Sequence, residues 1–292
     1  MNFKDQSDLK SIKEFNSAWL GPGTRADRLL SLKNKDSYYD DEEYLITNDV
    51  GDEKNINKEI SFNYKINKHG FRSNHFKAID SNKTTILTAG CSNSFGQGLP
   101  EELRWQSFLL KNLNNDDIDW FDLSSMGGSF RLITKNIISF IRNYGKPDYI
   151  FIIFPDIARD FMFNDKKNNF NDVSAHPFYL TKKQKSNIPK NFVDYTLTFN
   201  EYDALMKAIE HVWYLEELCK LSGIKLFWTS WEHRFHDEFF KLNFNNFIEQ
   251  TMPNNLNVNN LEYWDEANDK IHYGSKWTSW QGKMFSEIFL ND

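Results

Sequence analysis

Hydrophobic and polar positions follow two regimes along the chain, and the change falls near residue 84. Before it, the first 60 or so residues are polar without a sustained period, apart from a short helical pattern at residues 8–20 that ends at a Gly-Pro-Gly sequence. Four consecutive acidic residues at positions 40–43 indicate a solvated surface. We therefore expect residues 1–83 to form an N-terminal extension packed on a core domain of residues 84–292.

After residue 84, short apolar runs alternate with stretches of helical periodicity. Four runs are typical of buried strands: residues 85–89, 118–123, 149–154 and 224–229. Helical patterns cover residues 101–113, 132–143, 201–221 and 276–289. This alternation predicts an α/β fold, a three-layer α/β/α sandwich with a flavodoxin-like, mostly parallel sheet.

Residues 160–200 interrupt the alternation. The stretch is polar, has few periodic apolar positions, and is longer than an ordinary connection within a compact domain. It follows the strand expected at residues 149–154, so it leaves the sheet at the edge where α/β proteins bind ligands. We expect an insertion that lies over the functional site as a lid.

Composition narrows the class of protein. The 292 residues are 40% hydrophobic, enough for a sizeable core, and 26 Phe, 12 Tyr and 9 Trp argue against disorder despite a mean hydropathy of -0.65. A net charge of -6 gives no electrostatic reason to expect nucleic acid or an anionic membrane as a partner. Two cysteines can form neither a disulfide scaffold nor a four-ligand zinc site.

The sequence contains no candidate for a membrane anchor or a leader. No apolar run approaches the roughly 20 residues that cross a bilayer. The first 15 residues are charged and have no apolar core of the kind that defines a signal peptide. We therefore expect no membrane span and no signal peptide.

The candidate chemistry lies in residues 89–98, which read Ala-Gly-Cys-Ser-Asn-Ser-Phe-Gly-Gln-Gly between a predicted strand and a helix. Ser92 is expected at the carboxyl edge of the sheet, where its hydroxyl can meet a substrate. Amide groups of the turn can face a developing oxyanion. On its own, a serine in such a turn is more often a structural helix cap.

Asp269 and His272 form a second candidate pair before the last predicted helix. An acid and a histidine three residues apart can meet in a turn, where the carboxylate fixes the tautomer of the imidazole. The other imidazole nitrogen can then take a proton from a serine. A lone histidine is more often an ordinary satisfied residue, and the combination with Ser92 favours the catalytic interpretation.

These segments resemble the SGNH (GDSL-like) hydrolase family. The first block of the family is similar to residues 90–96, with Ser92 as the nucleophile, and its last block, Asp-x-x-His, matches Asp269 and His272. The second block, a glycine whose amide binds the oxyanion, is similar to residues 123–129, with Gly127 as the better match.

A further segment resembles family members that carry an N-terminal extension. Residues 67–72, Asn-Lys-His-Gly-Phe-Arg, are similar to an Asn-x-x-Gly-Phe-Arg sequence that precedes the first block in those members. The resemblance spans roughly residues 62–290, with the blocks in the order and spacing of the family. Similar extended members occur in bacteria and in their viruses, so the expected location is cytoplasmic or virus-associated.

Two departures from the family pattern stand out. Cys91 replaces the aspartate beside the nucleophile, which leaves the nucleophile itself unchanged. The third block should supply an asparagine that donates to the oxyanion, but the chain has Asp156 and Arg159 in that region and no asparagine. An ionised Asp156 cannot donate, so the third donor is either absent or another group such as Arg159. Loss of one such donor costs roughly 10²–10³ in rate.

The resemblance implies a serine esterase or deacetylase that hydrolyses a carboxylic ester through an acyl-Ser92 intermediate. The implied partner is a small-molecule or carbohydrate ester, with O-acetylated carbohydrates as one substrate class, and no metal or organic cofactor is needed. Two alternatives stay open. The missing asparagine favours a non-catalytic carbohydrate-binding or structural module, and an O-acyltransferase would use the same acyl-enzyme.

Other motifs have a plainer interpretation beside the functional one. Cys91 could act as the nucleophile with His272 as its base, although the family places this position inside the fold. His233 and His236 stand among acids and could bind a metal, but a solvated helix face is the commoner outcome. Trp277 and Trp280 are expected in the core of the last helix, with a sugar-stacking wall as the alternative.

Overall fold

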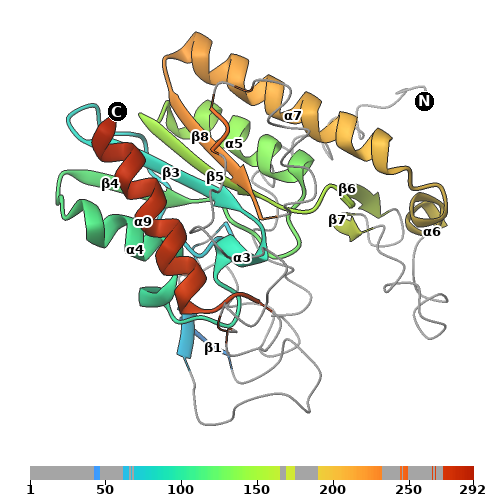
Figure 1. Ribbon diagram of the computed structural model, residues 1–292, viewed down its shortest axis with the longest axis horizontal. Coiled ribbons are helices and arrows are strands. Elements are labelled where there is room, and N and C mark those ends of the chain that lie inside the picture. Colours follow the sequence, from blue (N-terminus) through green and yellow to red (C-terminus); the bar gives the residue numbers. More distant parts are fainter. Residues whose placement is uncertain are drawn as a thin grey trace, which may run out of the picture.

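A four-stranded parallel sheet forms the centre of the molecule (Figure 1), in the order β4-β3-β5-β8. The computed structural model describes residues 43–46, 62–65, 67, 69–164, 169–174, 190–231, 244, 246–248, 265, 267 and 272–292. The strands of this sheet are β3 (Thr84–Gly90), β4 (Ile118–Asp122), β5 (Tyr149–Phe154) and β8 (Lys225–Ser230). All four match the predicted apolar runs to within one or two residues.

The strands bury side chains on both faces, as β5 illustrates. Ile150, Ile152 and Phe154 belong to one hydrophobic cluster, whereas Phe151 and Ile153 belong to the cluster on the opposite face. Successive side chains of a strand point to opposite faces, so an unbroken apolar run is what a strand needs when helices cover both sides.

Two pairs of helices cover the two faces. The cluster on one face includes side chains of α5 (Phe130–Tyr144) and α7 (Glu201–Ser222). The cluster on the other face includes side chains of α4 (Trp105–Leu113) and α9 (Ser275–Asn291). The prediction of a three-layer α/β/α sandwich with a parallel sheet is confirmed.

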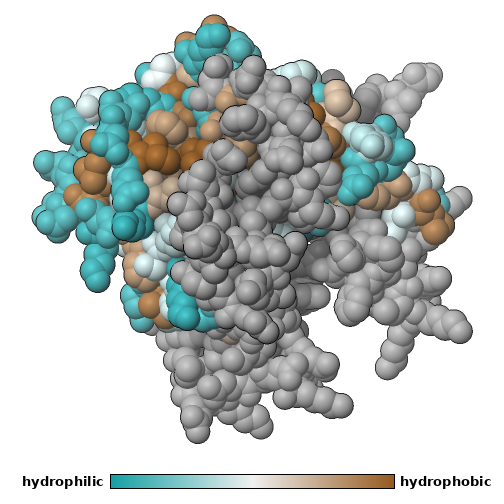
Figure 2. Space-filling model, in the orientation of Figure 1, coloured by the Kyte–Doolittle hydropathy of each residue, from teal (hydrophilic) through white to brown (hydrophobic). Residues whose placement is uncertain are grey.

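The helices α4 and α9 approach each other closely at Gly282. A Cβ atom on Gly282 would lie 2.5 Å from the carbonyl oxygen of Trp105, so a larger residue would push the helices apart. Beside this contact, the Thr278 hydroxyl donates to the Leu103 carbonyl at 2.6 Å. Figure 2 shows hydrophilic side chains on the outer face of α9, in keeping with exposed lysines and an acid at its surface.

Several elements differ from the sequence-based expectation. The helix predicted at residues 101–113 is divided, because a 3-10 turn, η2 (Glu101–Leu103), is followed by extended backbone at Arg104 before α4 begins. The reason is chemical: Arg104 is fully buried and its side chain is held by several partners, which fixes its backbone outside the helix. A short helix, α3 (Ser92–Phe95), follows β3 directly.

The expectation that the first 60 residues lack regular structure is wrong for one short segment. β1 (Glu43–Ile46) pairs antiparallel with β2 (Phe62–Lys65), a pairing that four-residue runs among polar neighbours do not reveal. The polar stretch after β5 also contains regular structure: an antiparallel pair, β6 (Arg159–Asn164) and β7 (Asn169–Ser174), and α6 (Lys190–Leu197). The helical pattern at residues 8–20 lies outside the described residues.

The segment before β3 packs on the sheet. Phe71 and Phe76 are buried in the cluster on the α5 side, where Phe76 meets the rings of Phe121 and Phe140. The domain boundary near residue 83 stays a prediction. In the part of the chain that the structure describes, no helix has the length and apolar character needed to cross a membrane.

Candidate active site

Ser92 is the first residue of α3, immediately beyond the carboxyl end of β3, and 5% of its surface is exposed. The turn depends on a glycine at position 90. A Cβ atom on Gly90 would lie 2.1 Å from Ser94 Oγ and 2.8 Å from the carbonyl oxygen of Ile153 on the neighbouring strand. Only a residue without a side chain allows the chain to turn this tightly beside β5.

The loop after Ser92 is fixed by its own backbone bonds. Gly96 ends α3 in the left-handed region, with φ of 72°, and its amide donates to the Asn93 carbonyl at 3.3 Å. The Gln97 amide donates to the Ser92 carbonyl at 3.1 Å. The Gly98 amide then donates to the hydroxyl of Tyr64 at 2.6 Å, which ties the loop to β2.

Two buried arginines hold the carbonyl groups of this loop. Arg72 Nη1 donates to the carbonyl oxygens of Phe95, Gly96 and Leu99 at 3.3, 3.0 and 3.0 Å. Arg104 Nη2 donates to the Ser94 carbonyl at 3.4 Å. Both arginine side chains are at most 1% exposed, so these bonds form away from bulk water.

The positive charges of the arginines are paired. Glu101 accepts from Arg72 Nε at 2.8 Å and from Arg104 Nη1 at 2.9 Å, and Arg104 also forms a fully buried ion pair with Asp122. Burial, reinforced by the charge of Arg104, lowers the pKa of Arg72 to about 10. Burial opposes ionisation of Glu101, but the charges of Arg104 and Arg72 outweigh it and lower the pKa of Glu101. Arg72, Arg104 and Glu101 are therefore charged near neutral pH.

The loop after β4 lies against the Ser92 turn. The Ser125 amide donates to the Gly90 carbonyl at 3.0 Å, and a Cβ atom on Gly128 would lie 3.2 Å from the same oxygen. Gly127, between them, has a φ of 78°, a conformation that favours glycine. The structure thus brings the loop of Gly127 and the turn of Ser92 to the same edge of the sheet.

Cys91 points into the fold. Its side chain is fully buried, and the indole N–H of Trp231, directly after β8, donates to its sulfur at 3.2 Å. A buried thiol that accepts a hydrogen bond at this place acts as a packing residue. The arrangement argues against Cys91 as the nucleophile.

Asp156 and Arg159 lie in the segment between β5 and β6. Asp156 Oδ1 accepts from the Ala158 amide at 2.7 Å, so its carboxylate stabilises the turn after β5. The guanidinium of Arg159 lies 5.7 Å from the centre of the Trp231 ring. Because Trp231 in turn contacts Cys91, Arg159 is linked through one ring to the residue beside Ser92.

His272 lies half-buried just before α9, and its carbonyl accepts from the Ala267 amide at 2.8 Å. Asp269 lies outside the described residues. Between the described residues Ser92 and His272 the structure contains no hydrogen bond. Contacts between a nucleophile and its base often form only when a substrate is bound.

Sequence reasoning missed Asp265, which caps α9. Its carboxylate accepts from the Ser275 amide and hydroxyl, both at 2.9 Å, and from the Lys276 amide at 2.8 Å. Gly274 precedes the helix and allows this approach, since a Cβ atom there would lie 2.5 Å from Asp265 Cγ. Asp265 thereby holds its own backbone against the first turn of α9, a few residues beyond His272. A cap that lies ten residues upstream has no local sequence signal.

The tryptophans and histidines that had alternative interpretations in the sequence have different outcomes. Trp277 is buried in the core, as expected, and Trp280 is half-buried against the same cluster. His233 and His236 lie outside the described residues. Within the described residues, no group of three histidine, cysteine, aspartate or glutamate side chains is arranged to hold a metal ion.

Comparisons with known proteins give a match only at the level of structure. No family model matches the chain, and no curated protein is similar to it in sequence. It is similar to the psychrotrophic esterase EstA from Pseudoalteromonas sp., inhibited by monoethylphosphonate, with 14% identity, a TM-score of 0.44, and coverage of 72% of this chain and 100% of that one.

Two further solved structures are similar to the chain, and both are described as lipolytic proteins of the G-D-S-L family. The one from Desulfitobacterium hafniense has 11% identity and a TM-score of 0.41, with coverage of 70% of this chain and 99% of that one. The one from Veillonella parvula has 12% identity and a TM-score of 0.31, with coverage of 70% and 98%.

Proposed function

We propose that the chain is a serine hydrolase that acts on carboxylic esters, with Ser92 as its nucleophile. The observation that carries the proposal is the position of Ser92 in a tight turn at the carboxyl edge of the sheet, with the loop of Gly127 bound to Gly90 beside it. A nucleophile and amide donors from two strand ends can surround one carbonyl group there.

In the proposed reaction, Ser92 Oγ attacks the carbonyl carbon of the ester while His272 takes the hydroxyl proton. The amides of Ser92 and Gly127 donate to the oxyanion that forms. The alcohol leaves with the proton held by His272, and water attacks the acyl-serine in the same way to release the acid. Asp269 is proposed to orient the imidazole. Arg159 is the candidate cation at the place of the missing asparagine donor, where it can bind the oxyanion or another oxygen of the substrate.

The alternatives from the sequence are a non-catalytic module and an acyltransferase. The turn around Ser92 is held by hydrogen bonds from Arg72 and Arg104. This supports a catalytic protein over a non-catalytic module, because a binding module has no need of a fixed serine. An acyltransferase would pass the same acyl group to an alcohol other than water. O-acetylated carbohydrates as substrates rest on the sequence resemblance alone.

The function of residues 160–200 as a lid also stays a prediction. β6 begins at Arg159, directly beyond the carboxyl end of β5, and this start point supports a position near the site. A lid at this place would govern substrate size.

Labelling with a fluorophosphonate, followed by peptide mapping, tests the proposal. We expect one label on Ser92, and loss of both the label and p-nitrophenyl acetate hydrolysis in Ser92→Ala. Ser94→Ala is the matched control, because it removes a buried hydroxyl from the same turn and should keep the label. A label on Cys91, or activity retained in Ser92→Ala, would contradict the proposal. Product that appears only with an added alcohol would identify an acyltransferase.

A further inference from the structure

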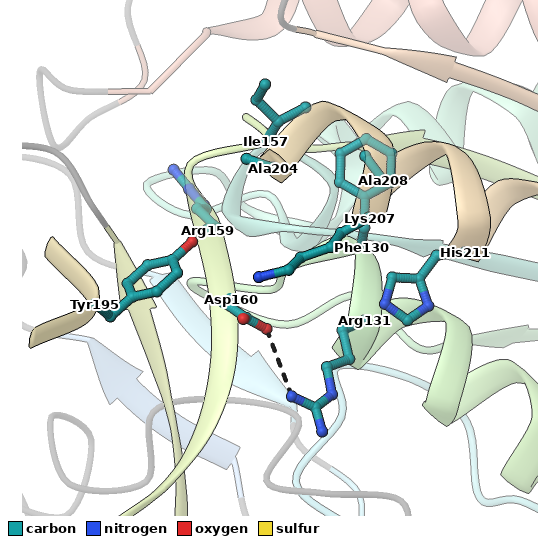
Figure 3. Close-up of a pocket in the computed structure, with 10 residues that line it drawn as sticks. All are labelled: Phe130, Arg131, Ile157, Arg159, Asp160, Tyr195, Ala204, Lys207, Ala208 and His211. Carbon is teal, nitrogen blue, oxygen red and sulfur yellow. Dashed lines mark ion pairs between the residues drawn. The ribbon is translucent and has the colours of Figure 1, made fainter. Parts of the chain in front are cut away.

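A pocket of about 230 Å³ lies beside the carboxyl edge of the sheet (Figure 3). Its walls come from four parts of the chain: the first turn of α5, the segment after β5, Tyr195 of α6, and the N-terminal half of α7. Phe130 and Ile157 form an apolar part of the wall, and Phe130 stacks on Phe154 of β5 with ring centres 4.4 Å apart. The pocket is therefore built on the core of the domain.

The charged side chains that line the pocket are mostly cationic. Arg131 comes from α5, Arg159 from the start of β6, and Lys207 from α7, and Figure 3 shows them gathered around one space. A single carboxylate in the lining, Asp160, opposes them, 3.9 Å from Arg131. The whole chain has a net charge of -6, whereas three cations and one carboxylate give the lining of this pocket a positive charge.

Polar atoms in the lining are left without partners. Arg159 Nη1 and His211 Nδ1 are buried atoms that have no hydrogen bond to any described residue. A buried donor without an acceptor is unfavourable, and an oxygen of a bound ligand would satisfy it. The first turn of α5 adds the positive end of a helix dipole at the same wall.

The pocket is linked to the proposed catalytic turn through the ring of Trp231. The guanidinium of Arg159 lies over the ring of Trp231, whose indole N–H donates to Cys91, the residue before Ser92. On the other side, Phe130 follows the loop of Gly127 by three residues. The pocket and the proposed site are thus connected through Trp231 and through the short segment from Gly127 to Phe130.

We propose that this pocket binds an oxyanionic group, a carboxylate or a phosphate, carried by the ester that Ser92 cleaves. The inference rests on the proposed function and narrows its substrate class to acidic esters. Arg159 offers paired N–H donors that suit two oxygens of such a group, and Lys207 adds a mobile point charge. Asp160 competes with the ligand for Arg131, and it therefore limits affinity.

Paired substrates test the proposal through kinetics. We expect 4-acetoxybenzoate and 4-acetoxyphenyl phosphate to have a higher kcat/KM than neutral methyl 4-acetoxybenzoate, and the two acidic arms separate carboxylate from phosphate. Lys207→Gln should reduce this preference about 3- to 10-fold, mainly through KM, with the neutral ester unaffected. Lys220→Gln, the same charge loss on the last turn of α7, is the control and should keep the preference. Equal kcat/KM for acidic and neutral esters would overturn the proposal.

A binding measurement separates this inference from the proposed function. Benzoate and inorganic phosphate are titrated into Ser92→Ala and monitored by calorimetry, so no hydrolysis is needed. We expect at least one of them to bind, Lys207→Glu to weaken the binding, and Asp160→Asn to strengthen it about 3- to 10-fold through the loss of a competing carboxylate. If neither anion binds, or if Lys207→Glu and Asp160→Asn leave the affinity unchanged, the pocket is not an anion site, whether or not the chain hydrolyses esters.

Discussion

Arg72 donates a hydrogen bond to the main-chain carbonyl of Gly96 at 3.0 Å and thereby ties a segment outside the parallel sheet to the turn that carries Ser92. The segment is a turn in its own right. Asn67 Oδ1 accepts from the amides of His69 and Phe71 at 3.0 and 3.1 Å, and Gly70 adopts a φ of 83°. This turn anchors the following phenylalanine, Phe71, in the core and directs Arg72 at the loop after Ser92.

Replacement of Arg72 by methionine should destabilise the domain and reduce activity together. The change removes a charged donor from three buried carbonyl groups, of which only that of Gly96 keeps another donor, the Leu99 amide, and it removes one cation from Glu101. We therefore expect a loss of about 2–4 kcal/mol in the free energy of unfolding. Arg142→Met is the control, because this exposed residue lies near the end of α5 and its loss should cost under about 0.5 kcal/mol. Urea unfolding measures the stability of both variants. If Arg72→Met is as stable as wild type, the hydrogen bonds of Arg72 do not stabilise the loop after Ser92.

The ion pairs of Glu101 with Arg72 and Arg104 make the stability of the domain sensitive to acid. Its folded-state pKa lies below the ordinary value, because Arg104 and Arg72 outweigh the effect of burial. The unfolded chain therefore binds more protons in acid, and the stability that Glu101 contributes is present above about pH 4.5 and lost as the pH falls through its folded pKa. We expect Glu101→Gln to be less stable than wild type at pH 7 and to converge with it in acid. Glu102→Gln, which removes an exposed neighbouring acid that has no ion pair with a described residue, should run parallel to wild type in thermal unfolding from pH 3 to 7.

Much of the fold could be predicted because its signals are local. Three strands of the central sheet, β3, β5 and β8, are largely apolar runs that fit burial on both faces, and β5 has identical bounds in the pattern and in the structure. The β1–β2 pair could not be predicted, since a four-residue strand among polar neighbours is defined by its partner and not by its own composition. The 3-10 turn before α4 was missed for a similar reason, because Arg104 leaves the helix to reach partners distant in sequence.

The candidate site shows the same division. Ser92 could be placed at the sheet edge from the strand-turn-helix pattern, and Gly127 was suggested by the family resemblance, since each follows a predicted strand closely. The residues that hold them in place, Arg104 and Asp122, are 18 residues apart and meet only when the sheet forms. Asp265 likewise caps a helix ten residues further along the chain. Contacts across such separations depend on topology, which a single sequence does not encode locally.

Gly90→Ala should disrupt the turn at Ser92. The added methyl group would meet Ser94 Oγ and also the main-chain carbonyl of Ile153, which cannot rotate away. We expect a loss of about 2–3 kcal/mol in stability and a fall in kcat, because the backbone shift moves Ser92. Gly223→Ala separates the two effects: its Cβ atom meets nothing closer than 3.9 Å, so only the left-handed backbone is strained, at about 1–2 kcal/mol, and activity should be kept. Unchanged kcat in folded Gly90→Ala would show that the turn tolerates the shift.

His211 provides a pH-dependent readout of the proposed anion pocket. Burial, reinforced by the charge of Arg131, lowers the pKa of His211, while Asp160 and Glu210 oppose the shift. The unfolded chain therefore binds more protons as the pH falls below about 6.5, so the contribution of His211 to stability is present above that value and is lost as the pH falls through its folded pKa.

A bound anion should reverse this effect, because its negative charge favours the imidazolium form of His211. By linkage, the pKa of His211 should rise when phosphate is added, since the bound anion stabilises a fourth positive charge in the pocket. The measurement is an NMR titration of the imidazole resonances between pH 5 and 8 with and without phosphate, assigned with His211→Gln. His75, an exposed residue that does not line the pocket, serves as the internal reference. A titration of His211 that is identical at zero and saturating phosphate would place the bound anion elsewhere.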